Sequence, residues 1–280
     1  MDIKKVPRMI IDFHTHLFPD LIAATTIDTL AKRAGVPSFS DGTADALHSS
    51  MKKAGIDYSV VLPVVTKPGQ FRSLNKFALG INEAYGNLDK NKMISFGGIH
   101  PDSSDYKGEL REIVKMGFKG IKLHPDYQQT KIDDIKNMRI IDFASEIGLI
   151  TSVHAGTDVG LPDEVHCKPE AALKVIREVA PENLVLAHLG GWKMWDLVEE
   201  YLVGEKVYFD TAVIFGYIEQ PQLLRIIKNH GSDNILFATD SPWSGQQESY
   251  DSLMNLPVTK EEKDNILYKN AARLLKISKL

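Results

Sequence analysis

The chain has 280 residues, of which 43% are hydrophobic and 25% charged, and its formal net charge at pH 7 is −4. This composition is that of a globular protein with enough apolar residues for a large core, and the length is ordinary for one α/β barrel. Basic and acidic residues are interspersed, so no nucleic-acid partner is expected.

The cysteine content and the N-terminal segment indicate the cellular compartment in which the protein is expected. Cys167 is the only cysteine, which excludes a disulfide within the chain and a cysteine-rich zinc site. The segment MDIKKVPRMIIDFH lacks the features of a signal peptide. No apolar run reaches the roughly 18 to 20 residues that span a bilayer. We therefore expect a cytoplasmic protein with no membrane partner, whose sequence also allows a homo-oligomer.

Eight short apolar segments, rich in β-branched residues, alternate with stretches of helical periodicity. Continuous apolar runs of this kind are typical of parallel strands that are buried on both faces. The expected strands are residues 9–17, 59–65, 94–100, 120–125, 149–156, 184–190, 207–213 and 235–242. The expected helices are residues 44–54, 74–88, a segment around 110–114 that ends at Gly117, 135–147, a segment that begins at Pro169, 192–202, 220–229 and 267–275.

A strand followed by a helix, eight times in succession, predicts an α/β fold of the closed (β/α)8 TIM-barrel type, here as a single domain over residues 1–280. An open doubly wound sheet would bring a Gly-rich loop after its first strand, where this chain has DFHTHLFPD. Residues 19–39 are long for a βα loop, so we expect an extra helix there that covers the barrel mouth.

Histidine and aspartate stand where the predicted strands end. Six of the nine histidines have this position, and barrel enzymes carry their active sites at the carboxyl ends of the strands. The strand-end residues are His14, His16, His100, His124, His154, His188 and Asp240. The sequence therefore indicates a site at this face.

His14 and His16 are two residues apart on a strand, so their side chains leave the same face and can bind one cation. Such a pair alone also fits two hydrogen-bonded core histidines. His154 and Asp240 at later strand ends favour ligation, and all four residues are interpreted as metal ligands. Asp12, earlier on the same strand, is expected to orient a neighbour.

Two of these residues are candidates for catalysis. Asp240 caps the following turn or, in the interpretation that we favour, ligates the metal and accepts a proton from metal-bound water. His188 positions the water and a developing oxyanion, or is a further ligand; a structural role under the Gly190-Gly191 turn is its alternative.

Lys122 and His124 share a face of their strand and are candidates for substrate binding. Lys122 contacts a substrate carboxylate, carries a carbamate that bridges two metals, or forms an ordinary salt bridge. His124 contacts substrate or forms a structural hydrogen bond.

The remaining polar residues have simpler expected roles. His100 is expected to be structural, and Asp210 either binds substrate or forms a turn. Cys167 is expected to be a bystander. We expect three histidines to be solvated, namely His48, His166 and His230. Aromatic residues after the strand ends are candidates for the wall of an apolar pocket: Phe18, Tyr127, Trp192, Phe215 and Trp243.

Four phrases of the sequence, IIDFHTHLFP, GIKLHPDYQ, LAHLGG and FATDSPW, resemble the amidohydrolase superfamily. They are similar in particular to its amidohydrolase-related branch, which contains aminocarboxymuconate-semialdehyde-decarboxylase-like proteins. The resemblance runs from Ile10 to about Leu275. It implies a TIM-type barrel with one divalent metal at the C-terminal mouth, on the four ligands named above, with His188 assisting the water.

The expected ligands, three histidines and one aspartate, suit zinc, with manganese, iron, cobalt or nickel as alternatives. In a binuclear pattern His154 and His188 would hold a second metal, bridged by a group from the fourth strand. No glutamate ends that strand and Lys122 is only a possible bridge, so one metal is the preferred prediction.

The expected activity is that of a metal-dependent hydrolase, in which metal-activated water attacks an amide, lactone or ester bond of a small molecule. The first alternative is a metal-dependent, non-oxidative decarboxylase of a small carboxylic acid. Two further alternatives are a phosphoesterase or nuclease, which the GIHPD phrase resembles, and a non-catalytic binding barrel.

Overall fold

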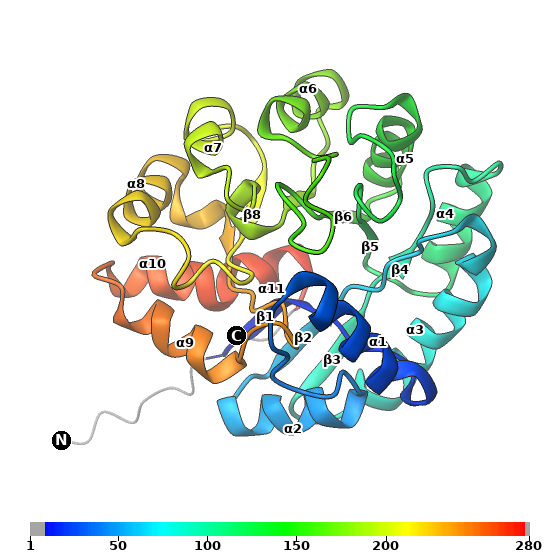
Figure 1. Cartoon of the computed structure of the whole chain (residues 1–280), viewed down its shortest axis with the longest axis horizontal. Helices are drawn as coiled ribbons and strands as arrows, with labels where there is room; N and C mark the ends of the chain where they lie inside the picture. The colour runs from blue at the N-terminus through cyan, green and yellow to red at the C-terminus, as the bar shows by residue number, and fades with distance from the viewer. Residues whose placement is uncertain (1–8, 278–280) are drawn as a thin grey trace.

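Parallel strands form a central barrel with helices around it (Figure 1). The computed structural model describes residues 9–277. The strands are β1 (Ile11–Thr15), β2 (Tyr58–Val61), β3 (Lys92–Ser95), β4 (Gly97–Gly98), β5 (Gly120–Leu123), β6 (Ile150–Val153), β7 (Leu184–Leu186), β8 (Tyr208–Asp210) and β9 (Ile235–Leu236). β3 and β4 flank Phe96 and follow one another directly, so they occupy one barrel position and the eight predicted strands are confirmed.

Backbone hydrogen bonds join the first strand to the last and close the barrel. Phe13 N donates to Phe237 O at 2.8 Å, and Asp240 N donates to His14 O at 2.8 Å. His16 N donates to Ser241 O at 2.6 Å. Within the third barrel position, Phe96 N donates to Val61 O at 2.9 Å, which continues the pairing of β2 with β3. The predicted (β/α)8 TIM barrel is therefore confirmed.

The interior of the barrel is filled by apolar side chains from most of the strands. Phe13 and Phe96 meet edge to face there, with ring centroids 5.9 Å apart, and neither is exposed to solvent. Val60 and Val185 pack in the same buried cluster. Because the strands are buried on both faces, their sequences are continuous apolar runs that end only where the polar site begins.

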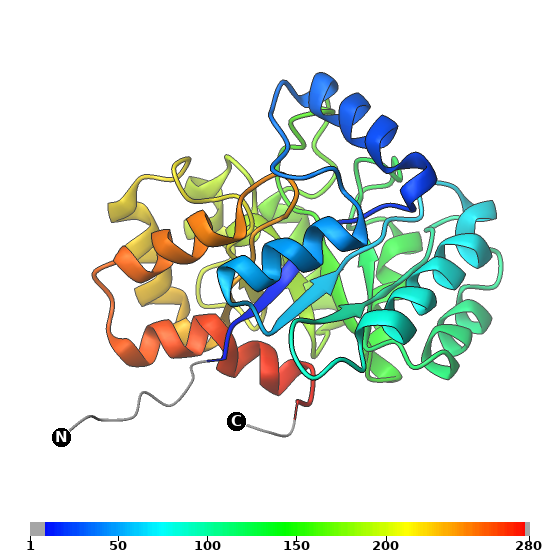
Figure 2. The same ribbon diagram turned by 90° about the horizontal axis from the view of Figure 1, so that it is seen from below.

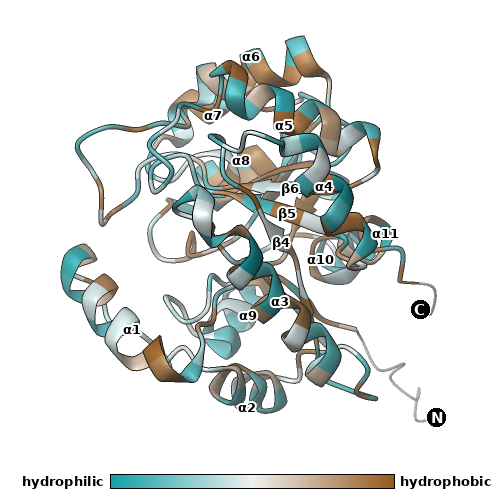
Figure 3. Ribbon diagram, turned by 90° about the vertical axis from the view of Figure 1, so that its right-hand side faces the viewer, coloured by the Kyte–Doolittle hydropathy of each residue, from teal (hydrophilic) through white to brown (hydrophobic). Residues whose placement is uncertain are grey.

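The helices surround the barrel in chain order (Figure 1). They are α1 (Asp20–Ala34), α2 (Ala44–Ala54), α3 (Phe71–Tyr85), α4 (Tyr106–Lys115), α5 (Ile135–Glu146), α6 (Pro169–Val179), α7 (Trp195–Tyr201), α8 (Gln220–His230), α9 (Gln246–Asn255), α10 (Lys260–Asp264) and α11 (Asn270–Leu274). A π-helical turn, Asn265–Lys269, joins the last two. In Figure 3 hydrophobic and hydrophilic residues alternate along these helices, as expected for helices with one face on a barrel. None of the described helices is long and apolar enough to cross a membrane.

The predicted extra helix after the first strand is α1, which stands off the barrel (Figure 2). Only Ala23 and Ile27 of its fifteen residues are buried. Its end is defined by Gly35, whose φ of 65° lies in the left-handed region that glycine adopts without strain. α11 lies at the opposite end of the molecule from α1 (Figure 2).

Candidate metal centre

Three side chains from the first and last barrel strands meet at the carboxyl end of the barrel. His14 Nε2 and His16 Nε2 are 3.1 Å apart. Asp240 Oδ1 lies 3.4 Å from His14 Nε2 and 3.1 Å from His16 Nε2. The closure of the barrel produces this arrangement, because the backbones of His14 and Asp240 are hydrogen-bonded to each other.

In both histidine rings, the partner of Nδ1 shows which nitrogen carries the proton. His16 Nδ1 is 2.9 Å from the carbonyl oxygen of Leu62, which can only accept, so Nδ1 carries the proton. His14 Nδ1 is 2.9 Å from Asp210 Oδ2 and likewise donates. Burial, with Lys122 nearby, holds the pKa of His14 well below its ordinary value and keeps the ring neutral. In the neutral rings both Nε2 atoms therefore present lone pairs.

Three atoms without protons thus face one another within 3.4 Å, and Asp240 Oδ1 is buried without a hydrogen-bond partner. Lone pairs at such distances repel one another unless a cation lies among them. Two imidazole nitrogens and a carboxylate oxygen are a donor set that fits a divalent transition metal. These residues therefore fit the metal that the sequence implies.

Lys122 lies beneath this cluster on β5, with Nζ 3.3 Å from His14 Nε2. Burial lowers the pKa of its ammonium to about 8, although the carboxylates of Asp210 and Asp240 oppose this shift. The ion pairs described for residues 9–277 do not include Lys122, which disfavours the salt-bridge alternative. Its place beside the candidate ligands fits either contact with a substrate anion or a bridging role.

His154, the fourth expected ligand, pairs with His188 rather than with His14 and His16. His154 Nδ1 lies 3.0 Å from His188 Nε2. His188 Nδ1 donates to the carbonyl oxygen of Ala212 at 3.0 Å, so its Nε2 is also free of a proton when the ring is neutral. The rings of His14 and His188 are 5.5 Å apart, so the two pairs are neighbours at one mouth.

A second group with metal-like spacing contains His124, His154 and Asp158. His124 Nδ1 accepts a hydrogen bond from the backbone N–H of Tyr127 at 3.4 Å, which places its proton on Nε2. His124 Nε2 then faces Asp158 Oδ2, 3.4 Å away, as a donor. A protonated nitrogen does not bind metal, so His124 and Asp158 are better described as a close polar contact beside the centre.

His124 packs its ring flat on His154, with centroids 4.2 Å apart and an interplanar angle of 6°. The sequence places His124 in substrate contact or in a structural hydrogen bond, and its two polar contacts fit the second alternative. Its ring nevertheless lies within the wall of the mouth, together with Tyr127, whose ring is 4.4 Å away.

Asp210 makes contacts with the candidate ligands that the sequence did not reveal. Rather than forming a turn alone, it accepts from His14 Nδ1 and from the backbone N–H of His188 at 2.9 Å. It therefore orients residues of both histidine pairs. Its position at the end of a strand was a signal, but its partners lie on other strands.

Asp12 orients its neighbours, as expected, but its main partners belong to the end of the chain. Its carboxylate accepts from Thr239 Oγ1 at 2.7 Å and from Gln246 Nε2 at 2.8 Å. Burial raises the pKa of Asp12 to about 7, although these hydrogen bonds oppose the shift. Asp12 thus ties the first strand to the segment that carries Asp240.

The expectation that three histidines are solvated is wrong for His230 and incomplete for His166. His230 is 5% exposed and stacks on Phe209 with centroids 3.9 Å apart. His166 Nδ1 is 3.1 Å from Asp126 Oδ1. His100 has the structural role expected, since its Nδ1 accepts from the backbone N–H of Asp102 at 3.1 Å.

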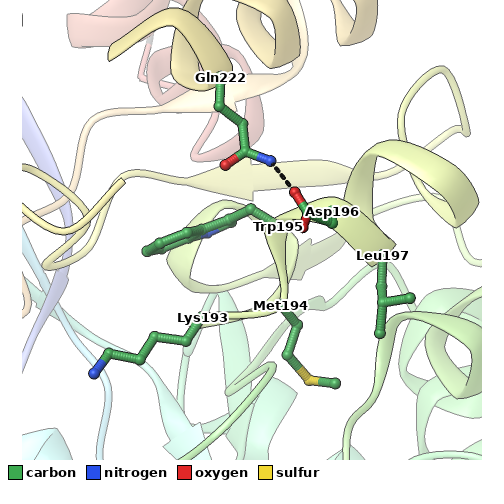
Figure 4. A pocket seen from close by; sticks show the side chains of 6 residues that line it. All are labelled: Lys193, Met194, Trp195, Asp196, Leu197 and Gln222. Atoms are coloured by element: carbon green, nitrogen blue, oxygen red, sulfur yellow. Dashed lines mark hydrogen bonds between the residues drawn. The ribbon is translucent and has the colours of Figure 1, made fainter. Parts of the chain in front are cut away.

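The centre itself is mostly buried. Exposure is 0% for Lys122 and 8% for His154 and Asp240, whereas the side chain of His16 is 16% exposed. A hollow of about 260 Å³ lies beside α7 and contains none of the strand-end histidines (Figure 4). It is lined by Lys193, Met194, Trp195, Asp196, Leu197 and Gln222. Of the expected aromatic wall, Trp192 approaches His188, with ring centroids 6.0 Å apart.

Solved structures with the same fold include proteins of known and unknown activity. An uncharacterised TIM-barrel protein from Bordetella bronchiseptica superposes with a TM-score of 0.76 at 18% identity, covering 96% of this chain and 98% of that one. A 5-carboxyvanillate decarboxylase from Sphingomonas paucimobilis gives 0.69 at 15%, covering 96% and 99%. A dihydroxybenzoic acid decarboxylase from a Polaromonas species gives 0.73 at 15%, covering 98% of each chain.

No curated protein matches the sequence significantly. The family model described as amidohydrolase matches residues 11–277, a span that includes every strand and all of the strand-end residues discussed above. The chain therefore belongs to the amidohydrolase family.

Proposed function

We propose that this protein is a metal-dependent, non-oxidative decarboxylase of a small, hydroxylated aromatic carboxylic acid. The observation that carries the metal dependence is the set of three proton-free atoms from His14, His16 and Asp240, which face one another within 3.4 Å. His154 completes the ligand set in this proposal. One divalent ion, manganese or zinc, supplies a fixed positive charge at the mouth.

Two considerations favour decarboxylation over the hydrolysis first expected. The similar structures include two decarboxylases of aromatic acids, and the Polaromonas enzyme was solved with manganese and the inhibitor 2-nitroresorcinol. The centre is also buried and carries the Lys122 ammonium beside the ligands. A carboxylate that leaves water for such a site is held by fixed charges rather than by solvent.

The chain's own groups have separate tasks in this reaction. Lys122 attracts the substrate carboxylate, and Trp192 and Tyr127 provide aromatic surface on either side of the histidines. The bond between the ring carbon and the carboxyl carbon breaks, CO2 leaves, and the ring carbon takes up a proton. Asp240 and His188 are the groups that hold and deliver that proton.

Hydrolysis of an amide, lactone or ester is the second candidate function. It is supported by Asp240, whose carboxylate lies beside His14 and His16 and would accept a proton from water at the centre. The two reactions differ in their products, since decarboxylation releases CO2 and hydrolysis incorporates an oxygen atom from water.

The test uses protein purified without chelator. Elemental analysis should find about one divalent ion per chain, and a panel of hydroxybenzoates should yield CO2. Incorporation of 18O from labelled water into products of lactones or amides would instead support hydrolysis. The Asp240→Asn and His154→Ala variants should lose both metal and turnover. Full metal content and turnover in both variants would exclude the proposed centre.

A further inference from the structure

A buried carboxylate next to His154 has one oxygen with no partner. Asp126 is 2% exposed, and its Oδ2 has no hydrogen-bond partner. His154 Nε2 lies 3.9 Å from this oxygen and is itself buried and without a hydrogen-bond partner. Unsatisfied buried polar atoms are costly, so two of them that face each other call for a physical explanation.

The other oxygen of Asp126 is fixed by a neighbouring loop. The backbone N–H of His166 donates to Asp126 Oδ1 at 3.1 Å, and His166 Nδ1 lies 3.1 Å from the same oxygen. The loop is anchored in turn, because Ile132 N donates to His166 O at 2.9 Å. These contacts hold Asp126 so that Oδ2 faces His154.

A buried carboxylate also lies beside the ring of His14, at hydrogen-bond distance. The buried carboxylate of Asp210 accepts the proton of His14 Nδ1, which leaves the lone pair on Nε2 toward the candidate metal. For His154 the ring is reversed: Nε2 faces a carboxylate, and Nδ1 faces His188 Nε2 at 3.0 Å. Histidine ligands are commonly oriented by a carboxylate on their second nitrogen.

We propose that Asp126 is a positioning residue that draws the proton of His154 to Nε2, so that Nδ1 is the metal-binding atom. The inference rests on the proposed metal centre. The competing tautomer has the proton on Nδ1, where it is donated to His188, and it removes His154 from the ligand set. Asp126 attracts the proton at Nε2 and disfavours that competitor.

The first test compares two matched substitutions. In Asp126→Asn the amide oxygen still accepts from His166, and an N–H₂ group faces His154 Nε2 and favours the wrong tautomer. Affinity for Mn2+, measured by competition with a chelator, should fall by roughly 10- to 100-fold. Asp158→Asn changes the carboxylate that pairs with His124, and its affinity should equal that of the wild type.

Each result has a distinct meaning. If the wild type binds no Mn2+, the proposed function fails. If the wild type binds and Asp126→Asn binds equally well, the role of Asp126 is overturned. An equal loss in Asp158→Asn would overturn it too, because that loss would place a cation among His124, His154 and Asp158.

A second measurement needs no variant. In zinc-loaded protein labelled with 15N-histidine, long-range 1H–15N spectra should show the His154 proton on Nε2. A proton on Nδ1 in the zinc-loaded wild type would contradict the inference even if Asp126→Asn failed to fold.

Discussion

Asp210 Oδ2 accepts a hydrogen bond from His14 Nδ1 at 2.9 Å, although 196 positions of sequence separate the two residues. Both side chains are almost fully buried, at 0% and 1% exposure. The contact fixes the tautomer of His14 and so decides which ring nitrogen faces the candidate metal. Asp210 therefore orients a ligand of the proposed centre.

Asp210→Asn tests this dependence. The asparagine oxygen would accept the backbone N–H groups of His188 and Ala212 that Asp210 Oδ1 accepts now. Its N–H₂ group would then face His14 Nδ1 and force the proton to Nε2. Metal affinity should fall by roughly 10- to 100-fold with the far-UV circular dichroism unchanged. Asp251→Asn, at an exposed position on α9, is the control and should bind metal normally.

Lys122→Met distinguishes the two roles that remain for this lysine, namely contact with the substrate carboxylate and bridging of two metals. If Lys122 holds the substrate carboxylate, the variant should keep its metal, since a positive charge 3.3 Å from a ligand atom is removed. The kcat/KM should fall by about 100-fold, the loss typical of one fixed charge in a dry site. Loss of metal together with activity would instead identify Lys122 as a bridging ligand.

The barrel and the strand-end site were predictable because both depend on local sequence patterns. Continuous apolar runs predict buried parallel strands, and the residue type that ends each run is visible directly. His14, His16 and Asp240 could be grouped because all barrel strands point their carboxyl ends the same way. Their convergence is a consequence of topology alone.

Contacts between side chains from distant strands were not predictable. Asp126 and Asp210 resemble ordinary turn residues in the sequence, and only the fold brings them to their histidines. α9 also escaped prediction, because its buried face includes Gln246 and Ser249 beside Leu253 and has no apolar periodicity. Gln246 is buried there because Asp12 accepts its hydrogen bond.

Gly156→Ala should destabilise the protein. Gly156 follows His154 and has a φ of 84°, and an added Cβ would lie 2.1 Å from the backbone nitrogen of Trp192. The free energy of unfolding should fall by more than about 2 kcal/mol. The added Cβ would displace the backbone at Trp192, and an alanine is also strained at this positive φ. Urea denaturation measures this change. Gly69→Ala is the matched control, since a Cβ there meets open space; equal effects would contradict the argument.

His230 should make stability depend on pH. Burial lowers its pKa to about 4, although its hydrogen bond to Val207 opposes the shift. Between about pH 6.5 and pH 4 the unfolded chain binds a proton that the folded chain does not, so stability falls as the pH falls. From pH 7 to pH 5 the wild type should lose about 2 kcal/mol more than His230→Gln. Parallel urea titrations of the two proteins at both pH values test this, and identical losses would count against it.

The bonds from Asp12 to Thr239 and Gln246 join parts of the chain that are 227 or more positions apart. The candidate ligands His14 and Asp240 are brought together by the same closure. A growing polypeptide that lacks its last barrel strand therefore lacks Asp240, one of the four proposed ligands. In the proposed centre, a metal ion held by all four ligands would require that the first and last barrel strands have already paired.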